Sequence, residues 1–335
     1  MATLRTPGGP QEPGPAAESQ APVGTPAEPV GGLPTYGGGV SGARSLRRMA
    51  RAVTANRKAT AGALLLLLFI VVAAIPGVIA HDDPTAEVYP KLLPPSAQHW
   101  LGTTALGQDI FAQVVYGTRP VLLIAFGVGL GATIIAMLIG VAAAYMGGVT
   151  DGVLSLITDV LLVIPLFPLL IILASYLHGA GTGVMIAVIT FTGWSYTARQ
   201  LRAQGLSLRK RDFLEAARVR GERSLYIITM EIIPTMTSLL VASFLTNALY
   251  AVLFSSGLQF IGLGDPNTTS WGTMLYWAEN NEAFQVAPLW IIVPGLCIVA
   301  LGAAFALVNY AFDEIGNPAL RPVRSMRRNR VKRAR

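Results

Sequence analysis

The sequence predicts an all-α integral membrane protein with six transmembrane helices and both chain termini in the cytoplasm. Three observations lead to this prediction: the composition, the lengths of the apolar runs and the positions of the basic residues. The 335-residue chain is 53% hydrophobic and only 13% charged, whereas soluble domains carry roughly 25% charged residues. Its apolar residues form six runs, each long enough to cross the ~30 Å hydrocarbon layer of a bilayer. The runs cover roughly 59–80, 121–146, 153–177, 181–201, 235–260 and 288–312.

Basic residues indicate the direction in which the chain crosses the membrane. Of the 25 lysines and arginines, all but Lys91 and Arg119 fall into three blocks: before the first apolar run, from Arg199 to Arg223, and after Leu320. Basic residues that flank membrane spans stay on the cytoplasmic side. Six spans that start in the cytoplasm place all three blocks inside and the two exceptions outside. The positive charge therefore marks orientation in a lipid bilayer, and no nucleic-acid partner is expected.

These boundaries divide the chain into five segments. Residues 1–43 are rich in proline and glycine and bury too little apolar surface to fold, so they predict a disordered cytoplasmic tail. The remaining segments are an N-terminal helix with the first span (44–80), an extracytoplasmic segment (81–119), a core of five spans (120–312) that includes a cytoplasmic helix at 207–224, and a basic cytoplasmic tail (313–335). Aromatic residues near the ends of the runs, including Tyr196, suit the membrane–water interface.

The cytoplasmic segment 207–224 predicts a short amphipathic helix on the membrane surface. Phe213, Leu214 and Ala217 fall on one helical stripe. Gly221 then ends the helix, because glycine readily adopts the left-handed conformation that follows many helix ends. A helix of this form suits insertion into a groove on another protein. A solvated loop would need neither the apolar stripe nor the glycine.

Ionisable residues near the spans offer a few further candidate sites. Asp159 lies inside the third run, ~10 Å from its cytoplasmic end. At that depth a carboxylate marks a functional site facing the bundle interior, although a structural hydrogen bond to a neighbouring helix explains it equally well. Pro165 follows, where a kink is tolerated if neighbouring helices satisfy the freed carbonyl. Outside, Asp109 and Arg119 either pair near an external entrance or are ordinary interfacial charges.

The sequence offers little support for catalysis, metal binding or ion-coupled transport. It contains no Ser-His-Asp or H-E-x-x-H constellation and no phosphate-binding G-x-x-x-x-G-K-[ST] motif. Cys297 is the only cysteine, which excludes a disulfide within the chain and argues against a thiolate metal site. We therefore expect no enzyme activity, no metal site and no cofactor held by this chain. Asp159 alone gives thin support for a secondary transporter, which usually places several ionisable residues at mid-membrane.

The cytoplasmic helix carries a recognisable pattern. The stretch reads Glu215-Ala216-Ala217-x3-Gly221-x9-Glu231-x-Ile233-Pro234. It resembles the EAA motif of ABC-importer permease subunits, the coupling helix that docks on the ATPase. The chain departs from the general pattern at Glu231, where isoleucine is usual, and at Ile233, where leucine is usual.

Three other stretches narrow the resemblance to the C-type permease subunit of dipeptide, oligopeptide and nickel ABC importers. The first runs from His99-Trp100-Leu101-Gly102-Thr103 through Asp109 to Arg119 and is similar to the first external segment of that family. The others are Phe260-x-Gly262-Leu263-Gly264 to Ser270-Trp271-Gly272, similar to its last external loop, and Asp159-x-x-Leu162-x-x-Pro165, similar to its third-span signature. The chain has Ile157 and Thr158 at the positions where that family often has arginine. The likeness covers about 55–322.

The resemblance implies a type I ABC-importer permease fold and one half of a translocation pathway. The residues that it assigns to ATPase coupling are Glu215, Ala216, Ala217 and Gly221, with Phe213 and Leu214 as apolar anchors. The implied partners are a homologous B-type permease subunit, two ABC ATPase subunits or domains that bind the ATP and magnesium, and an extracytoplasmic solute-binding protein or lipoprotein. The implied location is a bacterial inner (plasma) membrane, which the chain crosses several times.

The cargo that the resemblance favours is a di- or oligopeptide. Nickel or another small solute stays open within the same family. An ATPase-independent secondary transporter is the remoter alternative. Because one sequence does not show which helix faces turn inward, it assigns no residues that line the pathway.

Overall fold

The computed structural model describes residues 56–177 and 181–316, which belong to one unit, Gly42–Arg335. The predicted tail 1–43 and most of the tail 313–335 lie outside the described residues. Within the described ranges the structure consists of helices and loops and holds no strand. The helices are α2 (Arg57–Ala74), α3 (Pro76–Ile79), α4 (Ile110–Met146), α5 (Gly148–Val163), α6 (Leu166–Tyr176), α7 (Thr182–Arg209), α8 (Asp212–Val219), α9 (Ser224–Tyr226), the π-helix η1 (Ile227–Ile232), α10 (Ile233–Thr235), α11 (Thr237–Phe260), α12 (Trp271–Asn280), α13 (Ala283–Val286) and α14 (Leu289–Gly316).

Four of these helices are long and apolar enough to cross a bilayer: α2, α4, α11 and the Leu289–Tyr310 part of α14. The pair α5 and α6 meets the same test when taken together, but the two helices are bent by 86° at a short break. Helix α7 is long enough, yet it is not among the candidates. Its middle, from Thr190 to Arg199, mixes threonine, serine and tyrosine with apolar residues. The all-helical, multi-spanning membrane architecture predicted from the sequence is confirmed at this level.

Helix α4 is the central element, and it begins earlier than the sequence predicted. The apolar run starts near residue 121, but the helix starts at Ile110 and continues through Pro120 without a break. Its 37 residues span about 55 Å at 1.5 Å per residue, well beyond the ~30 Å apolar layer. One end of α4 therefore extends outside the hydrocarbon.

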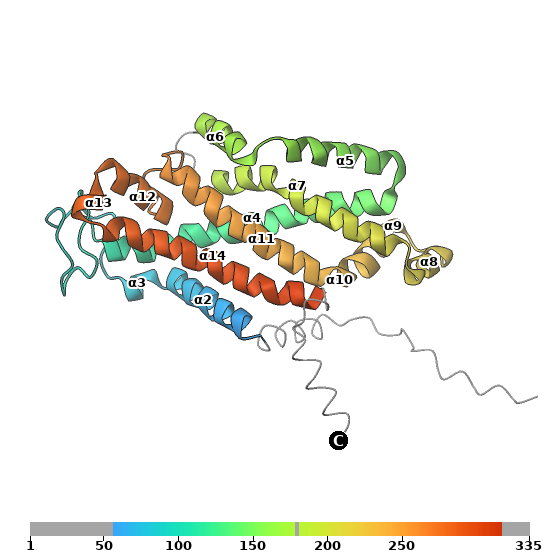
Figure 1. The fold of residues 1–335 in the computed structure, drawn as a ribbon, viewed down its shortest axis with the longest axis horizontal. Helices are drawn as coiled ribbons and strands as arrows, with labels where there is room; N and C mark the ends of the chain where they lie inside the picture. The colour runs from blue at the N-terminus through green and yellow to red at the C-terminus, as the bar shows by residue number, and fades with distance from the viewer. Residues whose placement is uncertain (1–55, 178–180, 317–335) are drawn as a thin grey trace, which may run out of the picture. The chain divides into compact units, whose positions relative to one another are not determined.

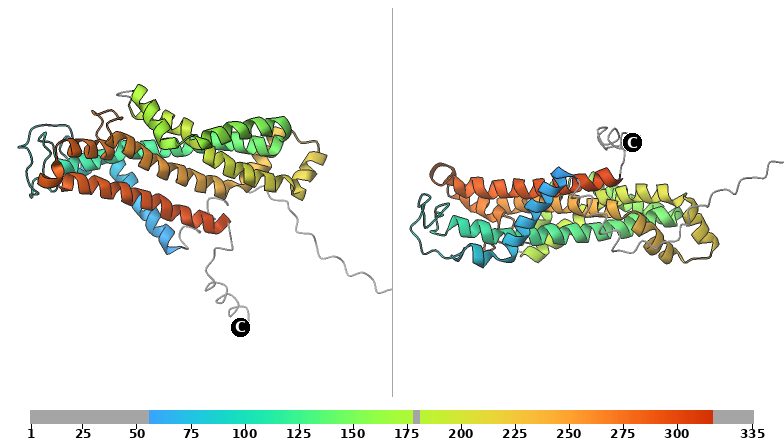
Figure 2. Two further views of the ribbon diagram at one scale, coloured as in Figure 1. Left: turned by 45° about the horizontal axis from the view of Figure 1, so that its top comes forward. Right: turned by 90° about the horizontal axis from the view of Figure 1, so that it is seen from below.

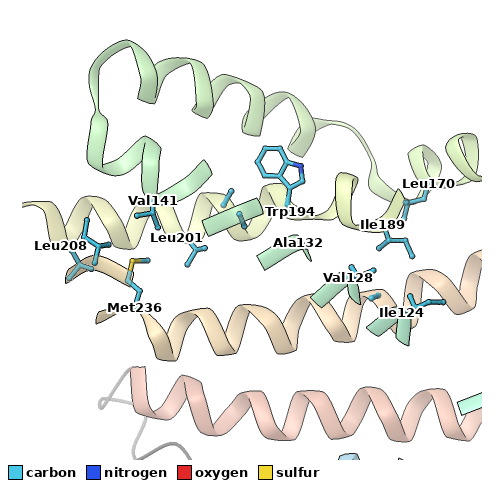
Figure 3. Packing of buried hydrophobic residues seen from close by; sticks show 14 of the residues in the cluster. Ile124, Val128, Ala132, Val141, Leu170, Ile189, Trp194, Leu201, Leu208 and Met236 are labelled. Carbon is cyan, nitrogen blue, oxygen red and sulfur yellow. The ribbon is translucent and has the colours of Figure 1, made fainter. Parts of the chain in front are cut away.

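Helices α7 and α11 pack along α4, α14 packs along α11, and α2 lies against α14, as Figures 1 and 2 show. The principal core lies where α4, α7 and α11 meet, and Figure 3 shows part of it, including Val128, Leu201 and Met236. Close packing depends on small residues. A Cβ on Gly140 of α4 would collide with the carbonyl oxygen of Ala198 on α7, so only glycine permits this approach.

The two ends of the bundle carry different structures (Figure 1). Helix α8 lies at one end, together with α9 and α10. The loop between α3 and α4, residues 80–109, lies at the opposite end together with α12 and α13. These two ends frame the candidate sites.

Candidate functional site

Helix α8 is a short helix that ends at a glycine. The N–H of Gly221 donates to the carbonyl oxygen of Arg218 at 2.9 Å, and the N–H of Glu222 donates to that of Ala217 at 3.2 Å. These two bonds form the Schellman motif, which places a left-handed residue after the helix. Gly221 fills that position with a φ of 75°. A Cβ there would meet no atom within 4 Å, so backbone conformation, not crowding, favours glycine.

The apolar stripe of α8 faces the chain's own core. Leu214 and Ala217 are fully buried and join one hydrophobic cluster with Leu208 of α7 and Ile227 of η1. Phe213 packs half-buried against the same cluster. The sequence predicted that this stripe enters a groove on another protein. In the structure the stripe instead attaches α8 to the rest of the chain, because the adjoining ends of α7 and η1 offer it a nearer apolar surface.

The exposed face of α8 carries the other predicted residues. Glu215 and Ala216 are exposed, and Val219 exposes 84% of its surface. Asp212 and Glu215 lie in the first helical turn, where negative charge is favoured by the helix dipole. The face therefore combines a small residue, an exposed valine and carboxylates. The predicted coupling residues thus divide into a buried set, which holds the helix, and an exposed set, which a partner can reach.

Two arginine–aspartate pairs join α5 to α7. Arg199 of α7 forms an ion pair with Asp159 of α5, and both side chains expose 56% of their surface. Arg202 binds Asp151 through two hydrogen bonds, of 2.6 Å from Nε and 2.8 Å from its terminal nitrogen. Such bidentate pairs fix the orientation of both side chains. Asp159 therefore forms a bond to a neighbouring helix, which is one of the two alternatives considered for it, while half of its side-chain surface stays accessible.

Pro165 lies at the break between α5 and α6. It begins α6 as its N-cap residue with φ of −64°, and the preceding Ile164 is extended, with ψ of 125°. A residue before proline is sterically driven out of the helical region. This explains why one apolar run becomes two helices, and the 86° bend is larger than the kink expected from the sequence.

A cavity of about 260 Å³ lies between α4, α5 and α7. Its polar walls are Ser155, Thr158, Asp159, Arg199 and Arg202, and Gly140 contributes to its α4 side. The sequence analysis treated Asp159 and the arginine block separately. In the structure Asp159 and the arginines at the start of that block line one cavity.

A second hollow, of about 190 Å³, lies between α4, α6, α7 and α11. Asn247 of α11 lines it and ties three helices together. Its amide nitrogen donates to Thr133 of α4, and its amide oxygen accepts from Thr197 of α7, both at 3.0 Å. All three polar side chains are buried. The sequence analysis did not identify Asn247. A polar triad satisfied in this way holds α4, α7 and α11 in one arrangement.

Asp109 has a structural position at the beginning of α4. Its carboxylate accepts a hydrogen bond from the N–H of Ala112 at 2.7 Å, which caps the helix, and a second bond of 2.8 Å joins it to Nδ1 of His99. Asp109 is buried, whereas Arg119 is exposed. Arg119 lies ten residues further along α4, about 15 Å at helical rise. Within the described ranges Arg119 forms no ion pair, so the pairing of these two residues, one of two alternatives above, is not formed.

Asp82 completes a cluster with His99 and Asp109, whose potential ligand atoms all lie within 4.8 Å of one another. Their hydrogen bonds have structural partners. The Tyr89 hydroxyl donates to Oδ1 of Asp82 at 2.8 Å, and this bond raises the pKa of the Tyr89 phenol above its usual 10.0. The ring of Tyr89 also packs edge-on against His99, with 4.4 Å between the ring centroids. The cluster serves to hold the 80–109 loop on α4, and the absence of a metal site stays a prediction.

The comparison with known proteins identifies the family. Over residues 132–315 the chain matches the family described as "Binding-protein-dependent transport system inner membrane component". That range is more than half of the chain and includes α8 and most of the bundle. The chain belongs to this family.

Individual relatives cover nearly the whole bundle. The "Oligopeptide transport system permease protein OppC" of Mycobacterium tuberculosis (strain ATCC 25618 / H37Rv) is 33% identical over 272 residues, which are 80% of this chain and 93% of the relative. The "Dipeptide transport system permease protein DppC" of Bacillus subtilis (strain 168) is 34% identical over 275 residues, 80% of this chain and 81% of the relative. A putative peptide transport system permease protein of Brucella abortus is 30% identical over 275 residues.

Membership of this family confirms that the chain is a transport permease component and not a catalytic subunit. It also agrees with the several apolar helices of a multi-pass membrane protein. The hollow beside Asn247 was missed because its lining comes from four helices. A signal was available in Tyr196. The run containing it was expected to end near residue 201, but α7 continues to Arg209, so Tyr196 lies near the middle of the helix.

Proposed function

We propose that this permease forms one half of the translocation pathway of an ATP-driven importer for di- or oligopeptides. The observation that carries the proposal is α8: a short helix at one end of the bundle, ended by Gly221, with Glu215 and Ala216 exposed. Its sequence pattern is that of an ATPase-coupling helix. The peptide cargo is supported by the names of the relatives from Mycobacterium and Bacillus, which are oligopeptide and dipeptide permeases.

The topology proposed with this function has six spans. Helix α7 serves as the fourth, because it packs along the apolar α4 and shares its core, and the bent pair α5 and α6 serves as the third. Both termini and α8 then lie in the cytoplasm of a bacterial cell, and the 80–109 loop lies outside its inner membrane. This arrangement keeps the order of segments expected from the sequence. Three bounds differ: α4 begins earlier, α7 continues to Arg209, and the cytoplasmic helix expected at 207–224 is the shorter α8, Asp212–Val219.

The proposed partners follow from the same assignment. A homologous B-type permease subunit supplies the other half of the pathway, and an extracytoplasmic solute-binding protein delivers the peptide. Two ABC ATPase subunits bind the ATP and magnesium, so this chain itself holds no cofactor. The exposed Val219 and Leu225 offer the apolar contact that such a docking surface needs at its centre.

The buried stripe of α8 explains how movement is transmitted. Leu214 and Ala217 lie in one cluster with residues of α4, α7 and α11, so a displacement of α8 is resisted by close packing and passes to these spans. A change in the ATPase dimer shifts the equilibrium between inward-open and outward-open arrangements if the docked helix has different contacts in the two states. Glu215 and Ala216 would make those contacts.

The test is uptake of labelled dipeptides by liposomes that contain this permease with its partner permease, its ATPase subunits and its binding protein. The wild-type complex should accumulate peptide only with ATP on the ATPase side. Gly221→Val should reduce uptake per ATP hydrolysed by at least about tenfold, because the strained turn tilts the exposed face of α8. Gly148→Val is the matched control: Gly148 also has a positive φ, of 57°, and open space around it, but it lies outside α8.

Three results would contradict the proposal. Normal uptake by Gly221→Val would show that the conformation at the end of α8 is not needed for coupling to the ATPase. Peptide accumulation without any ATPase subunit would indicate a secondary transporter. ATP-driven uptake of nickel or another small solute in place of peptides would keep the transporter class and overturn the cargo.

A further inference from the structure

The hollow beside Asn247 lies far from both ends of α7 and α11. Tyr196 is about 20 Å from either end of the 28-residue α7, and Tyr250 is about 20 Å and 15 Å from the two ends of the 24-residue α11. Leu166, which also lines the hollow, is the first residue of α6, at the break in the third span. All three helices thus meet near the middle of the bundle.

Both tyrosines are poorly suited to contact with lipid at this depth. Tyr196 exposes 54% of its surface and Tyr250 exposes 46%, and within the described ranges neither hydroxyl forms a hydrogen bond. Tyrosine in membrane proteins concentrates at the interfaces, where its hydroxyl reaches water. Acyl chains offer no partner for a hydroxyl. This face of α7 and α11 is therefore turned towards water or polar groups.

The ion pair between α5 and α7 extends the same face. Arg199 follows Tyr196 by three residues, and residues three apart are neighbours on a helix surface. Arg199 begins the basic block assigned to the cytoplasmic side. It and Asp159 each expose 56% of their side-chain surface, which suits contact with water or polar groups better than contact with lipid. Gly193, three residues before Tyr196, lines the hollow without adding a side chain. Along α7, Gly193 and Tyr196 thus line the hollow, and the ion pair of Arg199 follows one turn further on.

The size and lining of the hollow define what it can hold. Drug-sized ligands occupy pockets of at least ~300 Å³, so a hollow of about 190 Å³ in this half of the pathway has room for one side chain. Phe254 forms an aromatic wall between Tyr250 and Phe167, with ring centroids 6.1 Å and 6.0 Å away. The Asn247 amide is already satisfied by Thr133 and Thr197, so this side of the hollow is fixed.

We infer that this hollow is a side-chain site of the translocation pathway and takes one apolar or aromatic side chain of a peptide in transit. The ion pair of Asp159 and Arg199, one turn away, suits the charged ends of the same peptide, since a carboxylate and a guanidinium match an ammonium and a carboxylate respectively. The inference rests on the proposed function and adds to it a discrimination step inside the membrane.

The experiment compares the transport of two peptides by the complete complex in liposomes. The binding protein is first loaded to saturation with Ala-Ala or with Ala-Phe, so that its own preference does not enter, and the translocation rate of each peptide is measured. Tyr250→Ala should slow Ala-Phe relative to Ala-Ala by about tenfold, the discrimination that one apolar pocket provides. Tyr196→Leu should give a smaller change of the same sign. Phe191→Ala is the control, because Phe191 is an exposed aromatic residue of α7 outside the hollow.

The outcomes separate this inference from the proposed function. An unchanged rate ratio in Tyr250→Ala, with normal uptake, would overturn the side-chain site and leave the importer intact. Equal slowing of both peptides, with less partner permease co-purifying, would assign this face to the subunit interface and also overturn the site. If Tyr250→Ala fails to assemble, Tyr250→Phe and Tyr196→Leu supply the rate ratio instead. Absence of ATP-driven peptide uptake by the wild type would refute the proposed function itself.

Discussion

Helix α8 and the 80–109 loop lie at opposite ends of the bundle and are held in opposite ways. The loop is fixed by polar contacts: Thr103 accepts a hydrogen bond from the N–H of Leu93 at 2.8 Å and donates one to the carbonyl oxygen of Pro90 at 2.7 Å, and Asp109 binds both Ala112 and His99. Helix α8 is fixed by buried apolar side chains and leaves one face uncovered. Directional bonds suit a segment that keeps one conformation, whereas an apolar stripe suits a helix that presents a surface and moves with the elements beneath it.

The largest effect is expected from removing the apolar attachment of α8. Leu214→Ala should destabilise the packing of α8 by about 2–5 kcal/mol, because truncating a fully buried leucine loses its contacts and leaves a cavity. Hydrogen exchange of the α8 amides should rise and ATP-driven uptake should fall. Val219→Ala is the control, because Val219 is exposed and its truncation should leave hydrogen exchange unchanged. Equal exchange in both variants would show that the stripe does not hold α8.

A smaller effect is expected at the opposite end. Asp109→Ala removes the cap of α4 and the partner of buried His99, so we expect a loss of about 1–3 kcal/mol, measured as a lower unfolding temperature of the purified protein. Asp109→Asn keeps a capping oxygen and should lose less. Uptake by folded Asp109→Ala should remain ATP-dependent. A variant that folds normally but no longer transports would instead support the external gate considered from the sequence.

The smallest effect concerns Tyr89. Tyr89→Phe removes the hydrogen bond to Asp82 and should cost up to about 1 kcal/mol. Because the folded-state pKa of the phenol is raised above 10.0, the contribution of this bond is complete below pH 10 and disappears as the pH rises through the folded-state value. The difference in unfolding temperature between wild type and Tyr89→Phe should therefore be constant from pH 7 to pH 9. A difference that already fades in that range would contradict this role of the bond.

The sequence predicted the long apolar helices well, because the length and hydropathy of an apolar run are enough to identify such a helix. The runs at 59–80, 235–260 and 288–312 correspond to α2, α11 and α14. It also predicted α8 and its end at Gly221, since the periodic stripe and the glycine are local signals. The expectation that the apolar stripe inserts into another protein was wrong, because Leu214 is buried within its own chain. Nothing in one sequence shows whether such a residue packs on its own chain or on another.

The remaining differences between the sequence predictions and the structure have two causes. Some features depend on tertiary packing, and others had a sequence signal that was interpreted differently. The size of the bend at Pro165 depends on how α6 packs against α7 and α11, which the proline alone does not specify. For Asp109 the sequence left open a pair with Arg119 near an external entrance or an ordinary interfacial charge, although an aspartate just before a helix is a typical N-cap signal. The hollow is lined by Tyr196 and Tyr250, which lie 54 positions apart in the chain, and a single sequence gives no indication that they share one hollow.

The exposed face of α8 provides the most direct test of coupling to a cytoplasmic ATPase. Ala216→Cys, in a variant whose native Cys297 is replaced by alanine, places one thiol on that face. A membrane-impermeant thiol reagent should label it in inside-out vesicles only, and bound ATPase subunits should block the labelling. Labelling from the outer side of intact cells, or labelling that bound ATPase subunits leave unchanged, would contradict the account.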